Sequence, residues 1–272
     1  MKASKVRLSS CVRFEFSRGI VSVVPFLAAL AACACATQIA FSIEAHNAGI
    51  DGFRSVDAFA YVFRGMEVFR PESKLPFIVD AYWIVPRLLI GYIACFIPVR
   101  DLKGYSLQVV TRCGSRTGWI SAKLLLGTSA VVFYYIVCAL FAWANALVWG
   151  GFDPATNHVR PLFLGIDPQA SDISTCLALV LSLVADLSLV PLCMALALVF
   201  GAIVSFVSLV ALLILSAFFA NPYFWVNGTM LARSFLASSG GLDAEAIAFA
   251  CAFVLALGIA CCYLVGKKVE YR

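Results

Sequence analysis

Long apolar runs, separated by short polar stretches, make up most of this chain. A helix needs about 20 predominantly apolar residues to cross the hydrocarbon core of a bilayer. The longest run, Cys176 to Phe219, would be about 66 Å long as one helix, so it must fold back once, and Gly201 is the natural break. The pattern predicts six transmembrane helices, over Gly19–Phe41, Phe77–Pro98, Leu124–Trp149, Cys176–Val199, Ala202–Phe219 and Ala244–Val265.

The composition agrees with lipid as the main solvent. Apolar residues make up 62 % of the 272 residues and charged residues only 13 %, whereas a globular domain carries about 25 % charged residues. So few charges could not cover a soluble surface of this size. The expected fold class is therefore an all-α integral membrane protein.

The first apolar run follows a basic segment and contains an Ala-Cys-Ala-Thr sequence near its end, so a cleaved signal peptide is one interpretation. The run is longer than a typical signal core, and the polar segment before it is also long, so we expect an uncleaved first helix. Within residues 5–18, Leu8, Val12 and Phe16 are spaced four apart, with arginines between them. This spacing predicts a short amphipathic helix on the cytoplasmic leaflet.

The placement of lysine and arginine predicts the orientation. Segment 1–18 holds five of these residues, loop 98–123 holds five, and the C-terminal tail holds three. The loops on the other side are longer in total but hold only six: 42–76, 150–175 and 220–243. The positive-inside rule therefore places both termini in the cytoplasm, as an even number of spans requires.

Two of the outer loops have unusual composition. Loop 42–76 mixes aromatic and charged residues, which predicts a membrane-surface helix. Segment 220–243 is aromatic at first and then glycine-rich, which suits an interfacial or partly re-entrant segment.

The sequence contains no recognisable catalytic or metal-binding pattern. The sequence has no G-x-x-x-x-G-K-[ST] phosphate loop, and its two histidines, His46 and His158, lie in outer loops without a ligand pattern. Most of the 11 cysteines sit inside apolar runs, where they act as small hydrophobic residues. We therefore expect no enzymatic activity, no metal site and no cofactor bound by this chain.

Two charges fall inside predicted spans. Arg87 lies near the middle of the second span and Asp186 near the middle of the fourth. A lone charge at that depth costs at least about 2.5–3.5 kcal/mol, so we hypothesise that the two side chains pair across the bundle. The alternative is that Arg87 faces a neighbouring subunit or a water-filled pathway alone. Pro86 and Pro191 lie close to these charges and predict helix kinks.

A family resemblance rests on two stretches. The first reads Pro98-Val-Arg-Asp-Leu-Lys-Gly-Tyr105, then Gln108-Val-Val, Arg112, Ser115-Arg116 and Trp119-Ile-Ser-Ala-Lys123. The second reads Ile203-Val-Ser-Phe206, Leu213-Ile-Leu-Ser-Ala217, Pro222, Asn227-Gly-Thr-Met230, Arg233-Ser234 and Gly240-Gly241. The first resembles the loop between the second and third helices of ABC-2-type permeases. It is most similar to the branch associated with bacterial antimicrobial-peptide and bacteriocin export or self-immunity. Two positions depart from the family pattern: Gly118-Trp119, and Gly201-Ala202 at the fourth–fifth turn.

The resemblance implies a permease subunit of the bacterial cytoplasmic (inner) membrane that dimerises with itself or with a sister permease. A separate ATPase subunit would bind ATP and Mg. Segment 1–18 would be an elbow helix, 19–272 the six-helix domain, and loop 98–123 the site of a short coupling helix. The candidate coupling residues are Asp101, Tyr105, Gln108, Arg112 and Arg116. The loop's cations would also serve as a simple orientation anchor without any partner.

The function that this resemblance implies is ATP-driven export of a peptide or of an amphipathic, lipid-like molecule. A secondary carrier is one alternative, and it would need ion-binding acids in the spans, where Asp186 is the deep candidate. A non-transporting immunity protein that binds a peptide at the outer loops is another. A neighbouring gene for an ATPase with a phosphate loop would separate export from both alternatives.

Overall fold

The computed structural model describes residues 8–50, 53–66, 79–113, 116–149, 164, 171–238 and 240–268. Over these residues the chain is helical and contains no extended strand. The helices are α1 (Leu8–Asn47), α2 (Ser55–Val62), α3 (Ala81–Cys113), α4 (Arg116–Trp149), α5 (Asp172–Phe200), α6 (Ala202–Phe218) and α7 (Ala244–Lys268), with the short 3-10 helices η2 (Trp225–Thr229) and η3 (Leu231–Arg233) between α6 and α7.

Several of these helices are long and apolar enough to cross a bilayer, so the chain is an α-helical, multi-pass membrane protein. Five candidate spans lie in α1, α3, α4, α5 and α7: Val21–Asn47, Ala81–Leu102, Arg116–Val148, Asp172–Phe200 and Ala244–Gly266. The sixth predicted span corresponds to α6, which is apolar but has only 17 residues, or about 26 Å of helix. That length is slightly below the thickness of the hydrocarbon core, about 30 Å.

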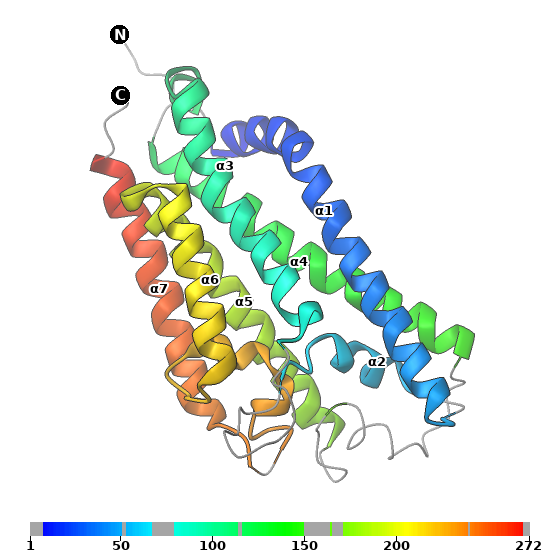
Figure 1. Ribbon diagram of the computed structural model, residues 1–272. Coiled ribbons are helices and arrows are strands. Elements are labelled where there is room, and N and C mark those ends of the chain that lie inside the picture. Colours follow the sequence, from blue (N-terminus) through cyan, green and yellow to red (C-terminus); the bar gives the residue numbers. More distant parts are fainter. Residues whose placement is uncertain are drawn as a thin grey trace.

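The bundle has two ends. The beginning of α1 and the end of α7 lie together at the end that is uppermost in Figure 1, here called the proximal end. The end of α1, the start of α5 and the 3-10 helices lie at the opposite end, here called the distal end. The start of α1 and the end of α7 thus lie at the same end of the bundle.

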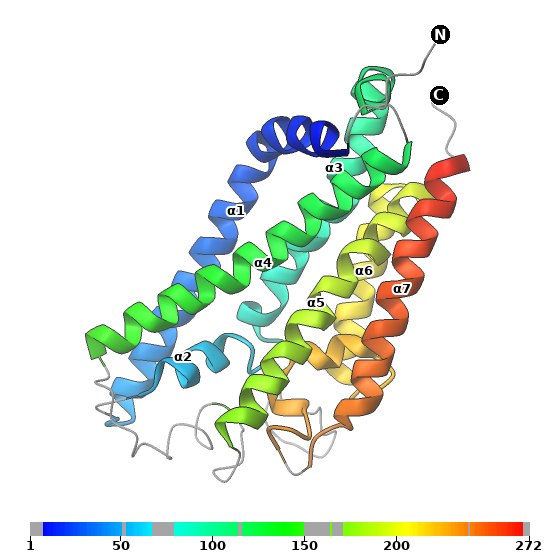
Figure 2. The same ribbon diagram turned by 180° about the vertical axis from the view of Figure 1, so that it is seen from behind.

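Helix α3 runs through the middle of the bundle and contacts α1, α4, α5 and α6. On one side α1 packs along α4, and on the other α5 packs along α7 (Figures 1 and 2). The α5–α7 contact is close at Gly258, where a Cβ atom would come within 2.9 Å of the Leu192 backbone nitrogen. Small residues permit this approach, which is how helices pack in lipid without a hydrophobic driving force.

The predicted break at Gly201 is confirmed. Gly201 ends α5 and begins α6 with φ of +89°, a conformation that residues with a side chain rarely adopt. The turn therefore depends on glycine.

The predicted loop 98–123 differs from expectation because it is almost entirely helical. Helix α3 continues through Pro98 to Cys113, and α4 begins at Arg116. Proline removes one main-chain hydrogen bond and kinks a helix, but neighbouring packing lets a membrane helix continue past it. The polar residues from Arg100 onward extend α3 beyond its apolar run rather than ending it.

The beginning of α1 lies across the bundle at the proximal end and then turns into the long leg of the helix (Figure 1). Pro25 lies inside α1, and a proline there leaves the Val21 carbonyl without its usual partner. The segment predicted as amphipathic, 5–18, is therefore helical from Leu8 onward, and it joins the first span without an interruption.

The two unusual loops both pack inward at the distal end. Helix α2, predicted to lie on the membrane surface, instead buries Ala58, Ala60 and Tyr61 against α1 and α4. Its apolar residues are more favourably placed against other helices than in water. Segment 220–243 folds back under the bundle, as a partly re-entrant segment would, and its Leu231 and Ala232 amides donate to the carbonyls of Phe63 and Arg64.

Candidate functional site

The structure brings together the two intramembrane charges, Arg87 on α3 and Asp186 on α5. Arg87 Nε lies 3.0 Å from Asp186 Oδ1, and Arg87 Nη2 donates a hydrogen bond of 3.1 Å to Asp186 Oδ2. Both side chains are 1 % exposed. Such a two-point contact uses the planar fork of the guanidinium, which a lysine could not reproduce.

Other buried polar groups complete this cluster. Tyr135 of α4 donates to Asp186 Oδ2 at 2.9 Å and lies 3.0 Å from the Ser182 hydroxyl. Arg87 Nη1 also donates to the Trp83 carbonyl at 2.6 Å. The pair therefore ties three helices together near the middle of the bundle.

The cluster also reaches the distal segment through Thr229, at the end of η2. Trp83 Nε1 donates to Thr229 Oγ1 at 2.9 Å, and Arg87 Nη2 donates to the Thr229 carbonyl at 3.4 Å. The guanidinium carbon of Arg87 lies 5.3 Å from the centre of the Trp83 ring, within the range of a cation–π contact. A movement of α3 relative to α5 would therefore change the contacts between α3 and Thr229, and so would act on segment 220–243.

Electrostatics explain why these residues gather. A charge inside a low-dielectric region is stable only when it is paired and hydrogen-bonded. Asp186 neutralises Arg87, while Tyr135 satisfies one of the carboxylate oxygens. The opposite charges of Arg87 and Asp186 can separate only if water or another ion replaces the partner. The pair is therefore suited to fixing α3 against α5, or to holding the two helices together in one conformation and releasing them in another.

A second buried arginine, Arg233, lies at the distal end. Its guanidinium donates to the carbonyls of Met66, Ser216 and Ala217 at 2.9, 2.5 and 2.6 Å, and to Asn227 Oδ1 at 2.8 Å. Ser216 and Ala217 belong to the last turn of α6, where carbonyls have no helical partner and a cation is favourable. Burial lowers the pKa of Arg233 to about 10, so the side chain stays charged near neutral pH.

The sequence pattern marked Arg233 as an outer-loop cation and as part of the second family-like stretch, but gave no sign of its burial. Three of its hydrogen bonds go to main-chain carbonyls, which leave no trace in a sequence. One signal could have indicated this contact: Arg233 follows shortly after an apolar helix, α6, whose end has no capping residue. Asn227, which begins an Asn-Gly-Thr sequon, is buried, and its Nδ2 donates to the Phe219 and Asn221 carbonyls.

The predicted coupling residues lie far from this cluster, at the proximal end. Asp101 forms an ion pair with Lys123 at 2.5 Å, which joins α3 to α4, and a further contact with Arg100 at 3.3 Å. Lys123 is 3 % exposed. The backbone of Tyr105, Gln108 and Arg112 belongs to α3, while their side chains lie outside the described part of the structure, and Arg116 begins α4.

Within the described part of the chain, no group of three or more histidine, cysteine, aspartate or glutamate side chains is placed to hold a metal ion. No family model, curated protein or solved structure matches this chain.

Proposed function

We propose that this chain is the permease subunit of an ABC transporter of the ABC-2 type, energised by a separate ATPase subunit. Its cargo is a peptide of the bacteriocin or antimicrobial kind, or an amphipathic lipid-like molecule. The permease acts in the bacterial cytoplasmic membrane as a homodimer or with a sister permease. ATP and Mg are bound by the partner and not by this chain.

The observation that carries the proposal is the helical extension of α3. The apolar run of α3 ends at Val99, before Arg100 and Asp101, but the helix continues to Cys113, a further 21 Å or so. In Figure 1 this end of α3 stands beyond the ends of α1 and α7. A helix that projects from the membrane on the side of the chain ends offers a docking surface for a soluble partner. This is the region whose sequence resembles the coupling segment of ABC-2 permeases.

The base of this projection is firmly attached. The Asp101–Lys123 ion pair joins α3 to α4 where the helices leave the apolar region. Since Lys123 is buried, removing Asp101 would leave a charge without its partner. A rigid base supports the proposal because a coupling element must pass a partner's movement on to the transmembrane helices.

The route for that movement is α3 itself. The same helix carries Asp101 at the proximal end and Arg87 in the buried cluster. Arg87 contacts α5 through Asp186 and the distal segment through Thr229. A displacement of the α3 projection would thus act on the contact that joins the two halves of the bundle.

The first experiment is purification of the tagged full-length chain in a mild detergent, with mass spectrometry of the proteins that accompany it. We expect an ATPase with a phosphate loop in the eluate. The double variant Gln108→Ala/Arg112→Ala should lose it, while Arg54→Ala, which removes a cation at the distal end, should retain it. A preparation that contains this chain alone across several detergents would overturn the proposal.

The Arg87–Asp186 contact also bears on the secondary-carrier alternative. A carrier needs an acid that binds and releases an ion within the membrane. Asp186 is instead engaged by Arg87 at both oxygens and by Tyr135 at one of them. An acid held in this way favours a structural role, so export remains the stronger proposal.

A further inference from the structure

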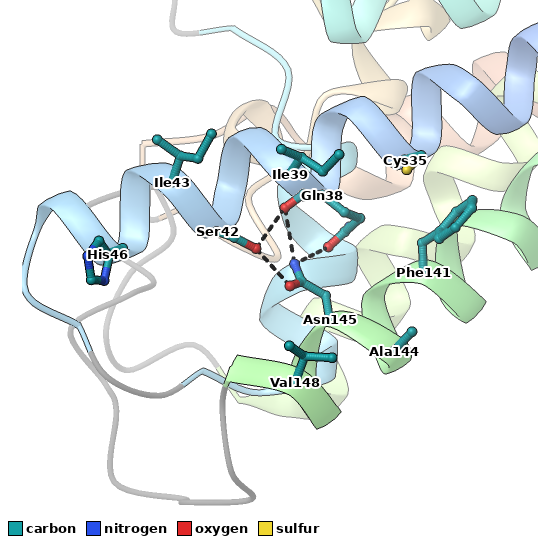
Figure 3. Close-up of a pocket in the computed structure, with 10 residues that line it drawn as sticks. All are labelled: Cys35, Gln38, Ile39, Ser42, Ile43, His46, Phe141, Ala144, Asn145 and Val148. Atoms are coloured by element: carbon teal, nitrogen blue, oxygen red, sulfur yellow. Dashed lines mark hydrogen bonds between the residues drawn. The ribbon is translucent and has the colours of Figure 1, made fainter.

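A cavity of about 390 Å³ lies between α1 and α4 in the distal half of the bundle. This volume falls within the range of about 300–1,000 Å³ that is typical of small-molecule sites. Its walls come from the two helices alone, and Figure 3 shows the side chains of both helices around the opening. They are Cys35, Gln38, Ile39, Ser42, Ile43 and His46 of α1, with Phe141, Ala144, Asn145 and Val148 of α4.

The floor of the cavity is polar but already hydrogen-bonded. Ser42 Oγ donates to Asn145 Oδ1 at 2.7 Å, and Asn145 Nδ2 donates to Gln38 Oε1 at 3.1 Å. Gln38 Nε2 donates in turn to the Ala58 carbonyl of α2 at 2.8 Å. Figure 3 shows the three side chains pointing toward one another between the helices. Water in the cavity would find few free partners, and buried water needs about three hydrogen bonds.

The rim of the cavity is apolar and open to the outside of the bundle. Ile39 and Ile43 are each 56 % exposed and Val148 is 76 % exposed. All three lie within the candidate spans Val21–Asn47 and Arg116–Val148. Since both helices are apolar enough to cross a bilayer, hydrocarbon is the medium that we expect around this opening.

The length of the cavity matches one leaflet. From Cys35 to His46, at the last turn of α1, the helix rises about 16 Å, roughly half of the hydrocarbon thickness of about 30 Å. The cavity thus runs from the level where α1 and α4 end to about the middle of the membrane. A single lipid chain in one leaflet covers the same depth.

We propose that this cavity binds one alkyl chain of a membrane phospholipid from the distal leaflet. The chain lies along the seam between α1 and α4, over the Gln38–Ser42–Asn145 floor, with its headgroup at the level of His46. A void in its place would cost the walls their dispersion contacts. The bound chain holds α1 at a fixed distance from α4 and is distinct from any molecule that the protein transports.

The test uses the full-length chain in vesicles of phosphatidylethanolamine and phosphatidylglycerol. The vesicles contain a small fraction of phospholipid with a diazirine on one acyl chain. After irradiation, mass spectrometry locates the cross-linked lipid. We expect the labels to concentrate on 35–46 and 141–148, above the level on α7 around Phe249 and Phe253, which are exposed on the surface of the bundle.

Filling the cavity should remove this labelling. Ala144→Phe takes the place of several methylene groups, and the loss of about ten carbon–carbon contacts lowers occupancy about tenfold. Ala252→Phe is the matched control, because Ala252 is an exposed alanine on α7.

If Ala144→Phe does not elute as a folded species, Val148→Trp at the rim replaces it. Labelling spread evenly over α1, α4 and α7, or unchanged by these variants, would overturn the proposal.

Discussion

The two buried arginines of this bundle solve the same electrostatic problem in different ways. Arg87, in the middle of the bundle, is neutralised by the carboxylate of Asp186. Arg233, at the distal end, is surrounded by three main-chain carbonyls and the amide oxygen of Asn227. Depth explains why Arg87 needs a neutralising carboxylate, since a net charge is most costly near the membrane centre.

The difference also separates two roles. The Arg87–Asp186 contact joins α3 to α5 through side chains, so it can break when the helices move and form again afterwards. Arg233 holds the end of α6 through backbone atoms that are always present, so its contact is permanent as long as the segment stays folded. One arginine is therefore suited to a moving contact and the other to a fixed cap.

The largest predicted effect comes from breaking the deep pair on one side. Arg87→Met or Asp186→Leu should each lower the free energy of unfolding by about 3–5 kcal/mol, because each leaves a buried charge without its partner. The double variant should recover most of that loss, since no charge remains. The measurement is the thermal unfolding of each purified variant in one detergent. Two damaging single variants with no recovery in the double variant would show that the side chains do not depend on each other.

Removing Arg233 should have the next largest effect. Arg233→Met leaves four buried acceptors short of a donor, and we expect a loss of about 2–3 kcal/mol. Arg233→Lys should restore only part of it, because an ammonium group lacks the planar fork that reaches several acceptors at once.

Three of the four acceptors named above are main-chain carbonyls, which no side-chain substitution removes. The acceptor of Arg87 is the Asp186 side chain, which a second substitution can remove. Thermal unfolding of the two variants and of wild type is the measurement. Full stability in Arg233→Lys would contradict the fixed-cap interpretation, because one positive charge alone would then suffice.

A smaller effect is expected at Tyr135, which supports the carboxylate side of the deep pair. Tyr135→Phe removes the hydroxyl that donates to Asp186, at a cost of about 1.5–3 kcal/mol for a hydrogen bond to a charged group. Tyr134→Phe is the matched control, because Tyr134 is buried on the same helix and its hydroxyl donates to neither Asp186 nor Ser182. Equal losses in the two variants would indicate a packing effect and no special role for Tyr135.

The sequence allowed the deep contact to be hypothesised but not the distal one. Arg87 and Asp186 are conspicuous because charged residues are rare inside apolar runs, and their similar depth suggested a pair. Arg233 lies in a polar loop, where a cation needs no explanation, and backbone carbonyls leave no trace in a sequence pattern. The sequence did predict the turn at Gly201, where the backbone conformation favours glycine.

The inward folding of the distal loops was not predictable in the same way. The aromatic residues of 53–63 fit a membrane surface and a packed interior equally well, because both environments are apolar. The tertiary contacts with α1, α4 and segment 220–243 decide between them. Similarly, Arg100 and Asp101 indicated where the apolar part of α3 ends, and Pro98 and Gly104 are typical helix-ending residues. The helix nevertheless runs past the predicted boundary at Pro98 to Cys113, because neighbouring packing lets a membrane helix continue past such residues.

The smallest predicted effect is that of an exposed arginine, which provides the reference for the two buried ones. Arg54 Nη1 lies 3.1 Å from Asp172 Oδ2, with the side chains 31 % and 56 % exposed. Water and salt screen such a pair, so Arg54→Ala should lower the free energy of unfolding by no more than about 1 kcal/mol.

Raising the salt concentration from 0.05 to about 0.5 M should reduce the difference between Arg54→Ala and wild type further, since the screening length shortens. The losses in Arg87→Met and Arg233→Met should not change with salt, because their contacts are shielded from ions. If all three variants responded equally to salt, water would reach all three arginines, and the distinction between buried and exposed charges in this bundle would fail.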